Sequence, residues 1–216
     1  MRRAVVIATD SQRVADALRP YGTRVVLTNP DHPNGTSRLA EAASILGLDD
    51  NDVVVNAQGD EPEMPPEVID AAATTLVNTP TAVVGTACCA FGPGEDPANP
   101  NIVKVVRGID GRALYFSRSR IPFDRDARGG EDARPLRHVG VYAYRVGFLK
   151  TYVTLPSTPL ERAESLEQLR VLEHGHTIAV ARCDAASGLT GIDTREQYDE
   201  FVRRWNSGSV DRRPGQ

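Results

Sequence analysis

The stretch VVVNAQGDEPE, residues 53–63, runs from three valines directly into two adjacent carboxylates and a proline. A short β-branched run closed by turn residues is typical of a buried strand. In a parallel sheet, the residues just past the carboxyl end of a strand lie in the crevice where ligands bind. The stretch therefore predicts an α/β fold with Asp60 and Glu61 at its ligand-binding edge.

These carboxylates have two interpretations. A carboxylate on such a turn can hold Mg²⁺ and leave the other metal positions to water and phosphate oxygens. A solvated turn over residues 59–62 fits the same residues equally well.

Working outward, short β-branched runs alternate with segments of helical period, the pattern of βα units around a mostly parallel sheet. We expect strands at 4–8, 24–27, 52–56, 82–90, 102–107, 112–117, 139–144 and 177–181. We expect helices near 10–18, 36–46, 66–77, 146–153, 160–174 and 194–205. This organisation predicts one α/β domain over residues 1–206, with helices on both faces of the sheet, a β-rich insertion and a disordered tail at 207–216.

Composition narrows the function. The chain has 216 residues, 40% hydrophobic and 25% charged, which is typical of one soluble globular domain. Its net charge of −4 argues against nucleic-acid binding, and no apolar run approaches the roughly 20 residues of a membrane span. Cys88, Cys89 and Cys183 form no CxxC pair, which favours buried thiols in the reducing cytoplasm.

A second acidic candidate lies far along the chain, in Ile192-Asp193-Thr194. Asp193 directly precedes the last expected helix. An Asp or Thr at such a position is most often a helix cap, so capping is the simpler interpretation of Asp193 and a ligand role is the alternative.

The loop at 31–38, DHPNGTSR, offers backbone amides at a helix start and the guanidinium of Arg38. These groups can bind a nucleotide base or phosphate. The loop is not a P-loop, because GxxxxGK[ST] occurs nowhere in the chain.

Two further segments carry polar candidates. In LRHVGVYAYR, residues 136–145, strand alternation places His138, Gly140, Tyr142 and Tyr144 on one face. That face can line a polar pocket or be an ordinary sheet surface. Glu167 and Gln168 fall in the middle of the helix expected at 160–174, where a solvated helix face is the default.

Six segments in one order resemble the 3-deoxy-manno-octulosonate cytidylyltransferase family. They are VNAQGDEP, PNIVKVV, ALYFSRSRIPFDRD, RHVGVYAYR, STPLERAESLEQLRVLEHG and TGIDTREQ. The resemblance extends over residues 4–205. It implies a Rossmann-like nucleotidyltransferase fold and an enzyme that joins CTP to a 3-deoxy sugar acid with loss of pyrophosphate, with Mg²⁺ neutralising triphosphate charge.

The resemblance also implies residue roles. Asp60 and Asp193 match the catalytic, metal-binding carboxylates of the family. The substrate contacts it implies are Gly35, Thr36 and Arg38 of the nucleotide loop, Gln58, Arg118 for acid or phosphate groups, and His138, Tyr142, Glu167 and Gln168 of the sugar-acid pocket. It further implies a cytoplasmic homodimer that serves lipopolysaccharide biosynthesis.

The chain departs from the family pattern in two places. Residues 34–38 read NGTSR where the family has SGT, an acidic residue and Arg. Family members also begin with a further strand, a loop resembling PARxxSxRLPGKPL whose Arg and Lys hold the triphosphate, and a helix. Met1 stands just before the family's second strand.

This second departure leaves alternatives. Without those residues we expect an exposed sheet edge and weaker triphosphate binding. A start-site error and a truncated form of little activity are the two explanations, and an in-frame reading of the DNA upstream of Met1 separates them. The functional alternatives are an inactive remnant that binds a sugar acid or dimerises, and a cytidylyltransferase for a related sugar acid.

Overall fold

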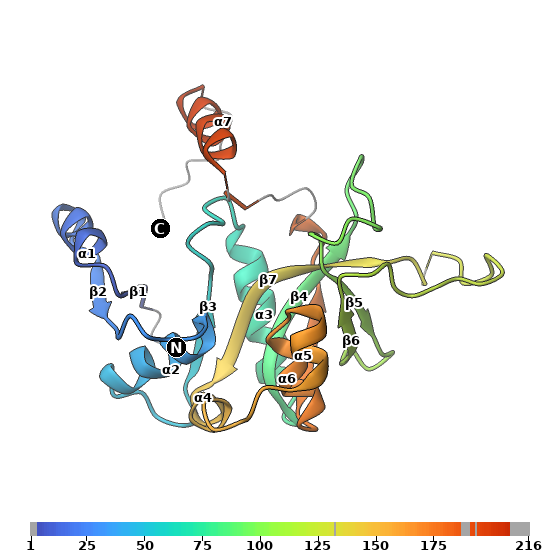
Figure 1. The fold of residues 1–216 in the computed structure, drawn as a ribbon, viewed down its shortest axis with the longest axis horizontal. Helices are drawn as coiled ribbons and strands as arrows, with labels where there is room; N and C mark the ends of the chain where they lie inside the picture. Colours follow the sequence, from blue (N-terminus) through green and yellow to red (C-terminus); the bar gives the residue numbers. More distant parts are fainter. Residues whose placement is uncertain (1–3, 132, 187–190, 193, 208–216) are drawn as a thin grey trace.

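The computed structural model describes residues 4–131, 133–186, 191–192 and 194–207 (Figure 1). The strands are β1 (Val6–Thr9), β2 (Arg24–Leu27), β3 (Val53–Asn56), β4 (Ala82–Ala90), β5 (Lys104–Arg107), β6 (Ala113–Ser117), β7 (Leu136–Arg145) and β8 (Thr177–Arg182). The α-helices are α1 (Gln12–Leu18), α2 (Gly35–Ile45), α3 (Pro66–Asn78), α4 (Val146–Tyr152), α5 (Pro159–Glu164), α6 (Gln168–Glu173) and α7 (Arg195–Asn206). The expected α/β class is confirmed.

The long strand β7 organises the main sheet. It pairs antiparallel with β4 along one edge, and its other edge is shared by β3 at one end and β5 at the other. β8 extends the sheet by pairing parallel with β4, whereas β1 and β2 form a separate parallel pair. The sheet is therefore mixed, and the expectation of a mostly parallel sheet was wrong, because β7 runs antiparallel to β3, β4 and β5.

Hydrophobic cores lie on both faces of this sheet. On one face α3 packs through Val68, Ala72 and Leu76 against Val139, Val141 and Ala143 of β7. On the other face α2, α4 and α6 surround a core that includes Tyr144, Phe148 and Leu169. The alternation expected for residues 136–145 is confirmed, since the aliphatic side chains of β7 face α3 and its tyrosines face the opposite side.

The helix expected at 160–174 is two helices, so that expectation was wrong. α5 ends at Glu164, its C-cap Ser165 has a left-handed backbone with φ 52° and ψ 51°, and α6 begins at Gln168. No glycine or proline marks this corner in the sequence. Glu167 is consequently the N-cap residue of α6, and Gln168 is its first residue with 7% of its surface exposed. Neither lies on a solvated mid-helix face.

The last helix, expected at 194–205, is α7, which begins at Arg195. Thr194 is its N-cap, since its hydroxyl accepts from the Gln197 amide while the Gln197 side chain accepts from the Thr194 amide. The described cap of α7 is therefore the threonine of the Asp193-Thr194 pair. Asp193 itself lies outside the described residues, as do residues 208–216 of the expected tail.

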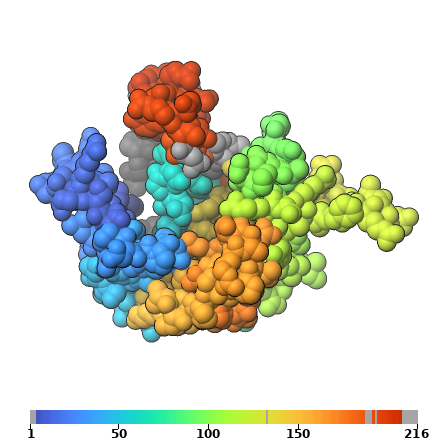
Figure 2. Space-filling model, in the orientation of Figure 1, coloured from blue at the N-terminus to red at the C-terminus, as the bar shows by residue number. Residues whose placement is uncertain are grey.

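The segment between β6 and β7 stands apart from the rest of the fold (Figure 1). The described residues between β6 and β7 form an arm that extends away from the body of the molecule (Figure 2). None of the helices in the described ranges combines the length and the apolar character that crossing a membrane requires.

Candidate active site

A cavity of about 240 Å³ lies at the carboxyl end of β3. Its walls come from the start of α2, the end of β3, the face of β7 that carries the tyrosines, and the corner between α5 and α6. The lining residues are Gly35, Thr36, Asn56, Gln58, Tyr142, Tyr144, Ser165, Leu166, Glu167 and Gln168. Six of the nine residues predicted as substrate contacts are thus brought together from four separate segments of the chain.

Thr36 lies at the centre of the polar groups. Asn34 caps α2 by accepting from the Ser37 amide at 2.9 Å, which fixes the first helical turn. Thr36, 4% exposed, donates its hydroxyl to Glu167 Oε2 at 3.1 Å and lies 3.3 Å from the hydroxyl of Tyr144. Since α2 and α6 are far apart in sequence, this contact locks two walls of the cavity together.

Burial sets the protonation of this cluster. It raises the pKa of the Glu167 carboxyl, and the hydrogen bond from Thr36 opposes that shift only in part. It also raises the pKa of the Tyr142 and Tyr144 phenols, which therefore remain protonated hydrogen-bond donors. The cavity presents a carboxyl group, three side-chain amides and two phenols, a set suited to a ligand rich in hydroxyls.

His138 lies beside the cavity and is not part of its lining. Its Nε2 is 2.9 Å from the hydroxyl of Thr86, which donates its proton to the carbonyl oxygen of Val141 at 2.7 Å. Because that hydroxyl has one proton, it accepts from His138, which is then the neutral Nε2–H tautomer. Burial lowers the pKa of His138 to about 3, and its ring packs 5.3 Å from that of Tyr142. His138 therefore packs against the ring of Tyr142 without lining the cavity itself.

The two predicted arginines bind protein groups. Arg38 donates to Thr28 Oγ1 at 2.7 Å and forms an ion pair with Asp10 at 3.0 Å, tying α2 to the loops after β1 and β2. Arg118 donates to backbone carbonyl oxygens near the corner at Ser165. Neither guanidinium belongs to the lining of the cavity.

The segment that follows β3 meets the segment before α7. Asp60 is exposed on the turn after β3, and its carbonyl oxygen accepts from the Ile192 amide at 2.7 Å. The two motifs that carry the predicted carboxylates are therefore adjacent, although Asp193 lies outside the described residues.

The described residues at this edge of the sheet suit Mg²⁺ better than a metal ion held entirely by protein ligands. Within the described residues no group of three or more His, Cys, Asp or Glu side chains could hold a metal ion, so a fully protein-ligated centre is not built from them. Magnesium commonly keeps several waters and needs one or two carboxylates plus phosphate oxygens. An exposed Asp60 fits that requirement.

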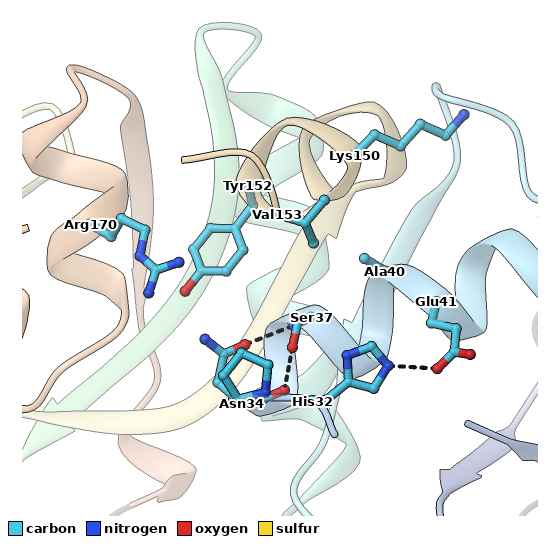
Figure 3. A pocket seen from close by; sticks show the side chains of 10 residues that line it. His32, Asn34, Ser37, Ala40, Glu41, Lys150, Tyr152, Val153 and Arg170 are labelled. Atoms are coloured by element: carbon cyan, nitrogen blue, oxygen red, sulfur yellow. Dashed lines mark hydrogen bonds and ion pairs between the residues drawn. The ribbon is translucent and has the colours of Figure 1, made fainter. Parts of the chain in front are cut away.

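A larger cavity of about 510 Å³ lies between the loop before α2 and the helices α4 and α6 (Figure 3). Its charged side chains already have partners: His32 lies 2.6 Å from Glu41, Lys150 2.6 Å from Asp50, and Arg170 Nε 2.8 Å from Glu161. Four residues of the loop at 31–38 line it, but none of the nine predicted substrate contacts and neither predicted metal ligand does. We therefore place the candidate active site in the smaller cavity.

Four lining residues were not among the predicted substrate contacts, namely Asn56, Tyr144, Ser165 and the apolar Leu166. Tyr144 was placed with Tyr142 on the alternating face that can line a polar pocket, but it was not given a substrate contact. Asn56 ends the predicted strand and carried no further signal. Ser165 had no signal, because its position depends on the unpredicted corner.

Comparisons with known proteins agree on one family. The sequence model of a family described as Cytidylyltransferase matches residues 1–178. A 3-deoxy-manno-octulosonate cytidylyltransferase from Leptothrix cholodnii is 50% identical over 206 residues, which cover 93% of this chain and 75% of that protein. A protein of the same description from Pseudoalteromonas translucida is 51% identical, covering 92% of this chain and 79% of its own length.

A solved structure agrees as well. It is described as CMP:2-keto-3-deoxy-manno-octonic acid synthetase complexed with CTP, and it superposes with a TM-score of 0.84 at 38% identity. The match covers 96% of this chain and 82% of that one.

Proposed function

The chain belongs to the 3-deoxy-manno-octulosonate cytidylyltransferase family, and from this premise we propose that it transfers the cytidylyl group of CTP to 3-deoxy-manno-octulosonate. The anomeric hydroxyl oxygen of the sugar acid attacks the α-phosphorus and loses its proton. The bond from the α-phosphorus to the bridging oxygen breaks, and pyrophosphate leaves. The observation that carries the proposal is the convergence of six family-matched residues on one cavity.

The sugar acid is assigned to the wall formed by α6. Glu167 and Gln168 present a carboxyl group and an amide side by side, and the hydroxyl of Thr36, which also contacts Tyr144, holds the Glu167 side chain in place. Groups of this kind bind sugar hydroxyls by donating and accepting at fixed positions. Their restraint before binding lowers the entropy that the ligand must lose on binding.

The nucleotide is assigned to the opposite wall. Gly35 and Thr36 form the first turn of α2, where backbone amides have no helical acceptor. Gln58, exposed after β3, offers an amide to the same space. These groups support binding of CTP beside the sugar acid.

Asp60 and Asp193 are the residues proposed to hold Mg²⁺. The exposure of Asp60 and the contact between its backbone and Ile192 support this assignment. Bound there, the ion would neutralise charge on the triphosphate.

The cellular compartment, the pathway and the oligomeric state of the enzyme are also proposals. The free, buried thiols of Cys88 and Cys89 suit a reducing cytoplasm, and the product suits lipopolysaccharide assembly. The homodimer is implied by the family resemblance, and the exposed apolar side chains of Leu114 and Phe123, on β6 and the arm, are candidates for its interface. Light scattering during size-exclusion chromatography tests the dimer, which a monomeric mass at micromolar concentration would rule out.

The deciding experiment measures pyrophosphate release from CTP, 3-deoxy-manno-octulosonate and Mg²⁺. The L. cholodnii protein serves as the positive control. UTP or GTP with a sugar phosphate serves as the specificity control, because an enzyme that activates sugar phosphates would use those substrates. The assay is run on this chain and on a version extended ahead of Met1 with a PARxxSxRLPGKPL-type segment. Pyrophosphate release that requires both CTP and the sugar acid supports the proposal. The proposal is overturned if this chain and the extended version are both folded and release no pyrophosphate while the positive control is active.

A further inference from the structure

We infer that Arg118 is a positioning residue for the sugar-acid wall, because its guanidinium holds the left-handed corner at Ser165 that turns Glu167 and Gln168 into the cavity. The identity of the ligand in this inference rests on the proposed function. The resemblance assigned Arg118 to acid or phosphate groups of the substrate. Its contacts in the structure point to a different task.

The corner requires an explanation because its backbone is unfavourable. Ser165 has φ 52° and ψ 51°, a region where a Cβ atom crowds the neighbouring carbonyl oxygen. Within the described residues, Ala127 is the other non-glycine residue with positive φ, and it lies on the exposed arm. Such a conformation persists where surrounding groups over-determine it, and it occurs preferentially at functional sites.

Arg118 supplies that restraint. Its Nε donates to the carbonyl oxygen of Glu164 at 2.7 Å, and its Nη2 donates to that of Ser165 at 3.3 Å. These carbonyls belong to the two peptide units on either side of the Ser165 Cα. A rigid planar guanidinium that binds both therefore fixes their relative rotation, which is the backbone conformation of Ser165.

Arg118 is itself fixed from several sides. Its Nη1 donates to the carbonyl oxygen of Pro100 at 3.1 Å, and its amide donates to the Glu164 carboxylate at 2.8 Å. The ammonium of fully buried Lys104 donates to the carbonyl oxygen of Arg118 as well as to Asn99 and Ile102 at 2.9 and 2.7 Å. The restraint on the corner thus originates in the packed β5–β6 hairpin.

Beyond the corner the chain continues directly into the site. Leu166 donates its amide to the carbonyl oxygen of Glu161 at 3.2 Å and is buried. Glu167 then reaches Thr36, and Gln168 follows with 7% exposure. A change in the backbone of Ser165 would rotate the next peptide units and displace both side chains, and displacements near 1 Å can cost about 100-fold in rate.

The test is a double-mutant cycle between Arg118 and Ser165. Glycine adopts the left-handed conformation without steric cost, so the S165G background should not need the guanidinium. In the parent, R118A should raise the KM for the sugar acid by about tenfold or more and change the KM for CTP less. In the S165G background the same change should have less than about a twofold effect. S165A is the matched control, because it removes the hydroxyl but keeps the Cβ, and there the effect of R118A should persist.

If Arg118 touched the substrate directly, its loss would be equally harmful in the S165G background, and that result would overturn the inference. R118K, which keeps the charge but loses the planar pair of donors, should resemble R118A. It carries the same prediction if R118A proves unstable.

A second readout does not depend on activity. Hydrogen exchange at the Leu166 and Arg170 amides, which are bonded to Glu161 and Glu167, should be faster in R118A and return toward the parent rate in R118A/S165G. Unchanged exchange in R118A would contradict the inference. If no variant and no parent protein releases pyrophosphate, the proposed function fails while the exchange rates still decide the role of Arg118.

Discussion

The amide of Ile192 donates a hydrogen bond to the carbonyl oxygen of Asp60, and so fixes the turn after β3 to the segment that precedes α7. We expect D60N to lower the kcat/KM of pyrophosphate release by roughly 100- to 1000-fold, because an amide cannot replace the charge at a metal-binding position. The melting temperature should stay near that of the parent, since the Asp60 side chain is exposed and the backbone bond is kept. E67Q, an exposed change in the first turn of α3, is the matched control. Parent-like activity in D60N would remove Asp60 from the site, and D193N should behave like D60N.

The buried carboxyl of Glu167 should lower the stability of the folded protein at high pH, although it is needed to bind the sugar acid. Because burial raises its pKa, the folded protein favours the neutral carboxyl, and stability is lost as pH rises through the folded-state pKa. E167Q is neutral at every pH and can still accept from Thr36. We expect it to melt at a higher temperature than the parent at pH 8 and at a similar temperature at pH 4, while the KM for the sugar acid rises. Lower stability of E167Q at pH 8 would contradict this.

The hydroxyl of Thr36 should contribute to folding stability and to sugar-acid binding through its hydrogen bonds and not only through the space it fills. T36V keeps the shape of the side chain but leaves Glu167 and Tyr144 without their common partner. A buried polar group left unpaired costs about 1–3 kcal/mol, so denaturant unfolding should show a loss of that order together with weaker sugar-acid binding. T36S retains the hydroxyl and should remain close to the parent. Equal losses in T36S and T36V would attribute the effect to packing.

His138 should weaken the protein in acid. Its folded-state pKa of about 3 lies below the ordinary value of 6.5, so the unfolded chain binds a proton that the folded protein excludes. Stability from this group is complete above pH 6.5 and is lost as pH falls toward 3. H138Q keeps a donor for Thr86 without that titration. The melting temperature of the parent should therefore fall more steeply than that of H138Q between pH 6.5 and 4, and parallel curves would contradict the assignment.

Local patterns in the sequence were sufficient for most elements. The strands expected at 24–27 and 82–90 have those bounds in the structure, because β-branched and small apolar residues fill them and turn residues close them. The alternation in β7 also predicted correctly that Tyr142 and Tyr144 share a face. These features depend on interactions within a few residues.

Features that depend on distant partners were not predictable from local patterns. The corner at Ser165 is held by Arg118, which directly follows β6, and nothing near Ser165 in the sequence signals it. The direction of β7 between β3 and β4 follows from chain topology, which side-chain periodicity does not encode. The substrate contacts were identified by resemblance to a family. Their convergence on one cavity became visible only in three dimensions.

The two-sided packing of β7 has a consequence for how this protein can vary. Its tyrosines serve the cavity while the residues between them hold α3. A substitution on one side leaves the other side in place, but an inserted or deleted residue within β7 would exchange the two sets and damage chemistry and folding at once. The adjoining arm projects free of both cores, so its length can drift without that penalty (Figure 2). Lineages should therefore differ in length at the arm and keep an invariant residue count within the strand.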